Sequence, residues 1–164
     1  MKTIIITGTP GTGKSTLAKL IAKRLHFKRI DVSSLIKKKK ISEGYDRKRK
    51  TKIVDTKKLN RELMSIIKNS KQNLIIDSHL SHYLPKKYVD LCIVVKCGLK
   101  KLYGRLKRRK YSKEKIRENL DAEIFEVCLD EARKFGHKIR IVDTTSKKEI
   151  SHLLKWLRLN IKRR

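Results

Sequence analysis

The segment with the clearest chemical meaning is Gly8 to Thr16, GTPGTGKST, which fits the pattern G-x-x-x-x-G-K-[ST]. Its glycines permit unusual backbone dihedral angles, so backbone N–H groups can wrap a phosphate chain while the helix that follows points its positive end at the anion. Lys14 would neutralise the β- and γ-phosphates of a nucleoside triphosphate, and Ser15 would supply a hydroxyl to Mg²⁺. The alternative, a chance glycine-rich turn, is disfavoured by the apolar run before the segment and the amphipathic pattern after it.

A second candidate is Asp77-Ser78-His79, at the end of an apolar run that starts at Asn73. An aspartate that ends a strand beside such a loop can hold a metal-bound water opposite the Ser15 hydroxyl. His79 could orient water or the substrate near the γ-phosphate. Two simpler interpretations stay open: Asp77 only ends a strand or caps a turn, and His79 is a surface or hydrogen-bonding residue.

Arginines supply a third candidate, in the segment Leu102 to Tyr111. Arg105 and Arg109 are four residues apart, so on a helix they share a face and both guanidinium groups can converge on one polyphosphate. They would act as a lid that neutralises charge on the migrating phosphoryl group and excludes water. The alternative is a solvated basic helix.

The elements around the glycine-rich loop have the order that a phosphate site needs. Thr3–Thr7 contains three consecutive isoleucines, as expected of a central parallel strand covered on both faces. From Lys14 onward, Leu17, Ile21 and Leu25 recur every four residues, which predicts a helix with one buried stripe. Strand, loop and helix therefore form a phosphate-binding βα unit.

The rest of the chain predicts further alternation of strands and helices. We expect strands at 28–32, 73–77, 90–95 and 138–142. A basic helix and a loop should lead to residue 54, and Asp55 should cap the next helix. Later helices are expected at about 99–109, from a cap at Ser112 to near Gly136 with Ile116, Leu120, Ile124 and Val127 on one face, and at 149–161. This pattern predicts an α/β fold with a five-stranded parallel sheet, helices on both faces, and the ligand at the carboxyl ends of the strands.

Composition sets further bounds. A chain of 164 residues is one domain by size, and no apolar stretch approaches the ~18 residues of a membrane span, so we expect a single soluble domain over 1–164, cytoplasmic or, in a eukaryote, nuclear. The 45 Lys and Arg against 16 Asp and Glu give a net charge of +29, which favours a polyanionic partner such as RNA, although each basic cluster alone reads equally as a solvated face. The clusters are 37–40, 47–50, 107–110 and 162–164. The three cysteines, Cys92, Cys97 and Cys128, fit neither a disulfide framework nor a metal site and are expected to be buried thiols.

Taken together, these segments resemble the adenylate kinase isoenzyme 6 family, also called the coilin-interacting nuclear ATPase family. The resemblance is carried by Gly8 to Thr16, Asp77-Ser78-His79, Arg105-x-x-x-Arg109-x-Tyr111 and the helix segment Glu118 to Ile124. It implies a P-loop NTPase fold of the nucleoside monophosphate kinase type with a short lid, and transfer of phosphate from Mg²⁺-ATP to AMP with an associated ATPase. It also implies a role in maturation of the small ribosomal subunit, through a platform ribosomal protein and nearby rRNA.

Carried over by position, the resemblance assigns the candidate site residues. Residues 31–55 would be the monophosphate-binding region and 105–118 the lid. Lys37 replaces an arginine common in adenylate kinases, which keeps the charge but loses the planar fork. Ser78-His79 replaces Gly-Phe-Pro-Arg, and the missing arginine favours a water-directed role for His79. The implied ATP-binding residues are Gly11, Gly13, Lys14, Ser15, Thr16, Arg109 and Lys147; those for AMP are Ser33, Lys37 and Asp55; those for Mg²⁺ are Ser15 and, through water, Asp77; and the catalytic ones are Lys14, Asp77, His79, Arg105 and Arg109.

Three functions remain open from the sequence. The first is an ATP:AMP phosphotransferase and ATPase acting in ribosome assembly. The second is a P-loop kinase for another small acceptor. The third is a nucleotide-switched factor that binds RNA or a ribosomal protein, with turnover incidental, which the basic composition supports.

Overall fold

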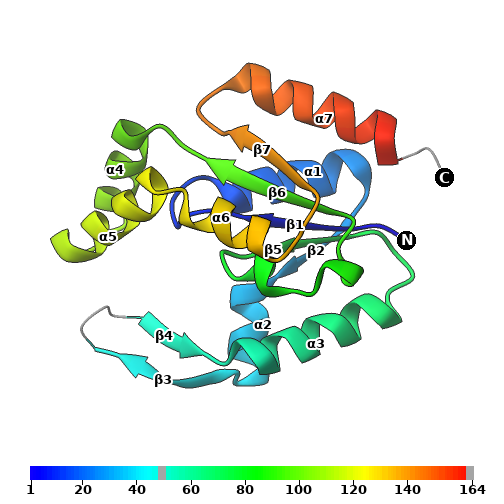
Figure 1. Cartoon of the computed structure of the whole chain (residues 1–164), viewed down its shortest axis with the longest axis horizontal. Helices are drawn as coiled ribbons and strands as arrows, with labels where there is room; N and C mark the ends of the chain where they lie inside the picture. The colour runs from blue at the N-terminus through cyan, green and yellow to red at the C-terminus, as the bar shows by residue number, and fades with distance from the viewer. Residues whose placement is uncertain (48–50, 162–164) are drawn as a thin grey trace.

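A five-stranded parallel sheet forms the centre of the protein (Figure 1). The computed structural model describes residues 1–47 and 51–161, and of residues 51 and 52 only the backbone. Most of the basic cluster at 47–50 and all of the cluster at 162–164 therefore lie outside the described residues. The strands run in the order β2 (Lys28–Asp31), β5 (Leu74–Asp77), β1 (Thr3–Thr7), β6 (Leu91–Lys96) and β7 (Ile139–Asp143). The predicted α/β fold and parallel sheet are confirmed.

The isoleucine run of β1 is explained by its central place in the sheet. β1 pairs with β5 on one side and β6 on the other, and all five of its residues are buried. Ile4 and Ile6 face a cluster formed with α1 (Lys14–Leu25) and α7 (Lys147–Ile161), whereas Ile5 faces the opposite cluster. Because both faces are covered, a continuous apolar run fits this strand and alternation does not.

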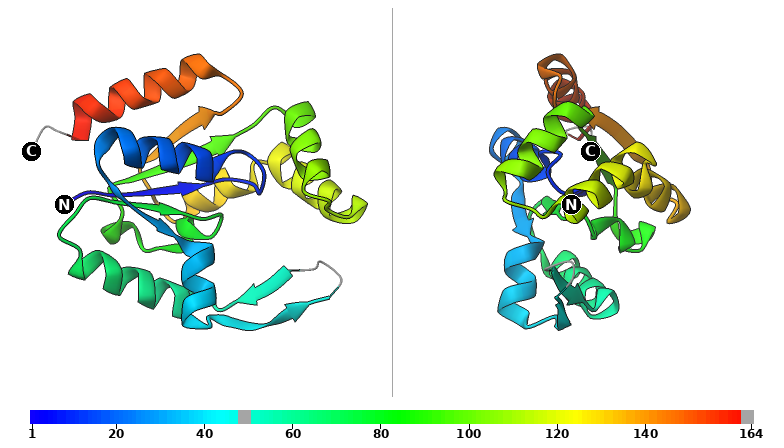
Figure 2. Two further views of the ribbon diagram at one scale, coloured as in Figure 1. Left: turned by 180° about the vertical axis from the view of Figure 1, so that it is seen from behind. Right: turned by 90° about the vertical axis from the view of Figure 1, so that its left-hand side faces the viewer.

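Three helices and two short helical turns cover the other face of the sheet. The second face is covered by α2 (Val32–Lys39), α3 (Thr56–Asn69) and α6 (Val127–Lys134), together with residues near the short helices η1 (Ser81–Tyr83) and η2 (Lys86–Tyr88). Figure 2 shows the resulting arrangement from behind and from the side. None of the described helices combines the length and the apolar character needed to cross a membrane.

Two projections stand at the side of the molecule where the strands end (Figure 1). One consists of α4 (Leu99–Arg108) and α5 (Lys113–Ile124), which pack through a small cluster of their own containing Leu102, Leu106 and Ile116. The other is an antiparallel hairpin of β3 (Ser42–Asp46) and β4 (Thr51–Val54). The two projections flank the edge of the sheet at which a ligand is expected.

The hairpin corrects one sequence prediction. A loop was expected up to residue 54, but α2 ends at Lys39, the next residue Lys40 adopts a left-handed conformation, and the chain then forms β3 and β4. None of the described side chains of β3 and β4 is buried, and Tyr45 and Ile53 are exposed. Without buried side chains at alternate positions, the described residues show no apolar alternation for a sequence pattern to detect.

The predicted long helix from Ser112 to Gly136 is also wrong. It is broken into α5 and α6 at Glu126, which has a φ of 52° and forms an ion pair with Lys96 of β6. Ile124 and Val127, expected on a buried face, are exposed. The break turns the chain so that α6 buries Leu129 against the sheet, a gain that helical periodicity alone does not show.

Two smaller corrections concern boundaries and thiols. The strand expected to end at Val32 ends at Asp31, whose carboxylate accepts hydrogen bonds from the N–H groups of Ser33 and Ser34 and so starts α2. Cys92 and Cys97 are buried as expected, but Cys128 is only partly buried, and all three are free thiols.

We expect Gly8→Ala to lower the free energy of unfolding by about 3 kcal/mol or more, because Gly8 has a φ of +138° and an added Cβ would meet the Val95 carbonyl oxygen at 2.3 Å. Gly104→Ala is the matched control: nothing lies within 4 Å of the Cβ it adds inside α4, so it should raise that free energy by about 0.5–1 kcal/mol. Urea unfolding of both variants measures the difference. Equal effects would contradict the close approach of β1 and β6 at Gly8.

Candidate active site

The glycine-rich loop adopts a conformation that few residues other than glycine tolerate. Gly8, Gly11 and Gly13 all have positive φ, and Gly13 directly precedes α1. Space adds a second restriction, because a Cβ on Gly11 would meet Leu102 of α4 at 2.9 Å. Thr144, after β7, donates a hydrogen bond to the Thr12 carbonyl. The loop is therefore held between the α4 projection and the end of β7, with the positive end of α1 open.

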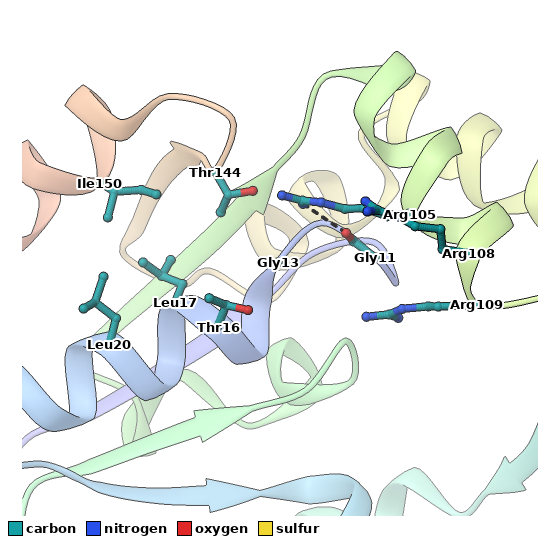
Figure 3. A pocket seen from close by; sticks show the side chains of 10 residues that line it. All are labelled: Gly11, Gly13, Thr16, Leu17, Leu20, Arg105, Arg108, Arg109, Thr144 and Ile150. Atoms are coloured by element: carbon teal, nitrogen blue, oxygen red, sulfur yellow. Dashed lines mark hydrogen bonds between the residues drawn. The ribbon is translucent and has the colours of Figure 1, made fainter.

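A cavity of about 400 Å³ lies on one side of this loop (Figure 3). Apolar side chains of α1 and α7 form one end and arginines of the α4 segment form the other, as Figure 3 shows. This division suits a ligand with a flat apolar part and an anionic part, such as a nucleotide. The lining residues are Gly11, Gly13, Thr16, Leu17, Leu20, Arg105, Arg108, Arg109, Thr144 and Ile150.

A second cavity of about 320 Å³ lies on the other side of the loop. It shares Gly11, Gly13, Thr16 and Arg109 with the first cavity, so the two meet at the loop. Its other lining residues are Pro10, Lys14, Ser15, Asp31, Ser33, Asp77, Ser78, His79, Tyr111 and Lys115.

Lys14 is buried in the lining of the second cavity, directly after the shared Gly13. Its Nζ donates to the Thr9 carbonyl oxygen at 2.9 Å, within the loop itself. Burial lowers the pKa of Lys14 from its ordinary value to about 8. A phosphate group placed here would stabilise the charged ammonium, so the loop is suited to bind an anion at Lys14.

Asp77 ends β5 and is 5% exposed. The strand register pairs it with Asp31 at the end of β2, which brings two carboxylates to the same edge of the sheet. Arg29 links them: its Nη2 donates to Asp77 Oδ2 at 2.8 Å and lies 3.2 Å from Asp31 Oδ2. No local sequence pattern indicates this role of Arg29, because its partner Asp77 is 48 residues away and becomes a neighbour only when β2 pairs with β5.

His79 lines the second cavity, and its ring keeps access to solvent. Partial loss of hydration by the surrounding protein lowers the pKa of His79 below its ordinary value, and the nearby charge of Lys14 lowers it further. The imidazole is therefore neutral at pH 7 and can accept a proton or a hydrogen bond.

The two lid arginines reach the loop from different positions. Arg105 donates from Nη1 to the Gly11 carbonyl oxygen at 3.2 Å. Arg109 lies just past the last residue of α4 and not on the helix as predicted, but it still lines both cavities. Arg108 and Lys115, which the sequence prediction did not name individually, line one cavity each. Both fall within the predicted lid range, where the density of basic residues was the available signal.

Comparison with known proteins agrees with this geometry. Residues 4–126 match the family model described as an AAA domain. The chain is 41% identical over 139 residues to the adenylate kinase isoenzyme 6 homolog of Dictyostelium discoideum, covering 85% of this chain and 78% of that protein. It is 38% identical over 161 residues to the Schizosaccharomyces pombe homolog, covering 94% and 90%. The chain belongs to the adenylate kinase isoenzyme 6 family.

Solved structures show the same fold at low sequence identity. Shikimate kinase from Acinetobacter baumannii, in complex with shikimate, is 15% identical and aligns with a TM-score of 0.67, covering 100% of this chain and 96% of that one. Deoxyadenosine kinase from M. mycoides, with bound dATP, is 16% identical with a TM-score of 0.60, covering 95% and 99%. These likenesses establish the P-loop kinase fold.

Three residues assigned through the adenylate kinase isoenzyme 6 resemblance do not line either cavity. Lys37 is exposed on α2, and Asp55 caps α3 by accepting a hydrogen bond from the Lys58 N–H group at 2.9 Å. Lys147 begins α7 and lines a separate groove with Arg24 and other residues. Ser33, the remaining residue assigned to AMP, does line the second cavity.

The second cavity also has the donor set that Mg²⁺ prefers. Ser15 presents an exposed hydroxyl, and the carboxylates of Asp77 and Asp31 lie in the same lining. Mg²⁺ prefers oxygen ligands, and in nucleotide enzymes it keeps several waters and binds through one or two carboxylates and the substrate phosphates. The described part of the chain contains no group of three or more His, Cys, Asp or Glu residues suited to a metal. The residues here therefore fit an ion that the substrate phosphates help to hold.

We expect Arg29→Ala to lower the free energy of unfolding by about 3 kcal/mol, because it leaves the buried Asp77 carboxylate without its ion-pair partner. Lys28→Ala, an exposed neighbour on the same strand, should change it by less than about 0.5 kcal/mol. Urea denaturation at pH 7 measures both. Equal effects would mean that Arg29 does not compensate the charge of Asp77.

ATP affinity should depend on the protonation of Lys14. Bound phosphates favour the ammonium, so the affinity should be constant below the pKa of about 8 and fall by up to about ten-fold per pH unit above it. Calorimetric titration from pH 6.5 to 9.5 tests this. The Lys14→Met variant should bind weakly without that decline, and the same decline in both proteins would assign it to another group.

Proposed function

We propose that this protein is an adenylate kinase that transfers the γ-phosphate of Mg²⁺-ATP to AMP, giving two ADP, and that it also hydrolyses ATP. The observation that carries this proposal is the meeting of two cavities at one phosphate-binding loop, with Lys14 in the second cavity directly after the shared Gly13. Direct phosphoryl transfer needs a donor and an acceptor on either side of the migrating group.

The first cavity suits the donor. Leu20 and Ile150 offer an apolar surface for a base, and Arg105 and Arg109 offer charge for the phosphates. With the phosphates bound at the shared glycines, the end of the phosphate chain would point toward the second cavity, next to Lys14.

The second cavity suits an anionic acceptor. Arg109 and Lys115 line it, and Ser33 lies near the positive end of α2. Lys14, Arg105 and Arg109 would neutralise charge on the migrating group, which supplies most of the catalysis in this reaction type. Mg²⁺, held by Ser15 and through water by Asp77, would add charge neutralisation on the phosphates when bound.

Hydrolysis is the side reaction that His79 supports. A neutral imidazole in the acceptor cavity can hold a water molecule by accepting its hydrogen bond. The segment after Asp77 also lacks the arginine that ends Gly-Phe-Pro-Arg in ordinary adenylate kinases, and Lys37 does not line the cavity. Water is therefore a stronger competitor for the phosphoryl group than in a site with those contacts.

We further propose a role in maturation of the small ribosomal subunit and processing of rRNA, with a platform ribosomal protein and rRNA as partners. Family membership supports this, as does the net charge of +29, which favours association with a polyanion. The absence of Lys37 and of the usual arginine from the acceptor cavity favours a second candidate. This candidate is a nucleotide-switched binding factor in which hydrolysis of ATP matters more than transfer. Co-purification with ribosomal precursors, with and without ATP, distinguishes the two.

The direct test is to incubate the protein with Mg²⁺-ATP, alone and with each nucleoside monophosphate, and to quantify ADP and free phosphate. Formation of two ADP per AMP without free phosphate supports the kinase, and phosphate release unaffected by AMP supports the second candidate. Lys14→Ala serves as the control and should abolish both activities without unfolding the protein. Turnover retained in that variant would exclude the loop as the catalytic site.

His79→Ala should lower ATP hydrolysis by roughly ten- to ten-thousand-fold, the range for one positioned catalytic group, with little change in ATP binding. Transfer to AMP should fall less, because the acceptor phosphate is itself held by cations whereas water must be held by the protein. Phosphate release and ADP formation are measured on the same variant. Equal loss of both would assign His79 a structural or shared role, and no loss of either would leave it a surface residue.

A further inference from the structure

A buried polar network lies next to the Asp77–His79 segment and lines neither cavity. The segment continues into η1, which packs between the end of β1 and α6. His82 of η1 is 1% exposed and Thr7, the last residue of β1, is 0% exposed. Polar side chains so deeply buried are costly unless they are paired, which points to a role that depends on the pairing.

The pairing links three elements in a row. Thr7 Oγ1 lies 2.7 Å from His82 Nδ1, and Glu131 Oε2 of α6 lies 3.0 Å from His82 Nε2. The same carboxylate accepts a hydrogen bond from the Tyr83 hydroxyl at 3.0 Å, through its other oxygen. His137 donates from Nε2 to the His82 carbonyl oxygen at 2.8 Å, which fixes the backbone of η1.

The protonation of the His82 ring decides which atoms in these contacts donate hydrogen bonds and which accept them. The Glu131 carboxylate lies off the N–H axis of His82 Nε2, so it acts on that proton more by charge than through an aligned hydrogen bond. It still favours a neutral imidazole protonated on Nε2. The lone pair of Nδ1 is then free to accept the Thr7 hydroxyl proton.

This Thr–His–Glu sequence of contacts has the order of a nucleophilic triad, but burial rules out that use. Thr7 has no exposed surface and lines neither cavity, so its hydroxyl cannot reach a substrate. Thr7 lies between the phosphate loop and the Asp77–His79 segment. It immediately precedes Gly8, the first glycine of the loop, and its Oγ1 lies 3.5 Å from the His79 carbonyl oxygen.

We propose that Thr7, His82 and Glu131 are positioning residues that hold the Asp77–His79 turn at a fixed place relative to the phosphate loop. Backbone contacts already tie Ser78 to β1 through the Ile6 carbonyl, at 3.2 Å. The Thr7–His82 hydrogen bond adds a side-chain tie one residue closer to the loop, and Glu131 extends it to α6. The role in turnover rests on the proposed function, whereas the structural tie does not.

Two substitutions of Thr7 separate positioning from packing. Thr7→Val keeps the shape of the side chain and removes the hydroxyl, and Thr7→Ser keeps the hydroxyl and removes a methyl group. If the site needs only a filled core, the Ser variant is the impaired one. If it needs the hydrogen bond, the Val variant is impaired, because His82 Nδ1 loses its partner in a buried site.

The readouts are amide hydrogen exchange at residues 78–80 and kcat for ATP hydrolysis. We expect exchange to accelerate and kcat to fall roughly ten-fold in Thr7→Val, with ATP affinity unchanged, while Thr7→Ser stays near the wild-type protein. Should Thr7→Val exchange and turn over like the wild-type protein, or should the Ser variant be the slower one, the proposal is overturned. Exchange that responds without any change in kcat also overturns a role in catalysis. A wild-type protein that turns over no ATP contradicts the proposed function alone, because exchange still tests the tie.

A second pair of variants keeps the test available if Thr7→Val does not fold. Glu131→Ala removes the carboxylate from His82, and Tyr83→Phe removes only the other hydrogen bond to the same carboxylate. Nitrogen-15 NMR of the His82 ring should show a proton on Nε2 in the wild-type and Tyr83→Phe proteins and its loss or redistribution in Glu131→Ala. An Nδ1-protonated ring in the wild-type protein would overturn the proposed direction of the contacts.

Discussion

Concentrated positive charge around a phosphate-binding loop is the constraint on which the site depends. Lys14 is buried, and it and Arg105 both donate to carbonyl oxygens of the loop itself, at Thr9 and Gly11. The Thr9 carbonyl compensates Lys14 only in part, because burial lowers the pKa of Lys14 to about 8 despite this contact. A polyphosphate offers the same donors full charges in place of dipoles, so the loop binds such an anion with donors that are already in place.

The rest of the fold holds this loop in shape. β1 holds the start of the loop in a fixed place because it is buried between β5 and β6. Gly8 has no Cβ, so the chain can pass close to the Val95 carbonyl as it leaves β1. α4 lies over Gly11, and the Thr144 hydroxyl reaches Thr12 from the end of β7. Elements from both halves of the chain therefore meet at one loop, which explains why the two cavities share its glycines.

The negative charge at the site is compensated by an arginine and not by the loop. The carboxylates of Asp31 and Asp77 are neighbours because their strands pair in register, and Arg29 lies between them. Such an arrangement keeps two acids close to a possible Mg²⁺ position without leaving like charges uncompensated. Arg29 and the proposed metal ion would act on the same Asp77 carboxylate, so metal binding would be coupled to the Arg29–Asp77 ion pair.

The sequence by itself determined the features whose cause is local. The glycine pattern requires positive φ at fixed positions, the isoleucine run requires a strand covered on both faces, and the four-residue spacing after Lys14 requires a helix; all three are present. The Asp77 and His79 assignments to the phosphate region follow from the same logic, because a residue at the end of a parallel strand must lie at the ligand edge.

Tertiary structure alone decided the features that depend on distant partners. Arg29 meets Asp77 only when β2 pairs with β5, and His82 meets Glu131 only when α6 packs on η1. The break at Glu126 and the β3–β4 hairpin were missed, the first because burial of Leu129 outweighs helical continuity and the second because none of the described hairpin side chains is buried. Sequence patterns indicate which side chains of a segment are buried and which are exposed. The contacts above depend on which segments become neighbours, and these neighbours are determined only when the whole sheet has formed.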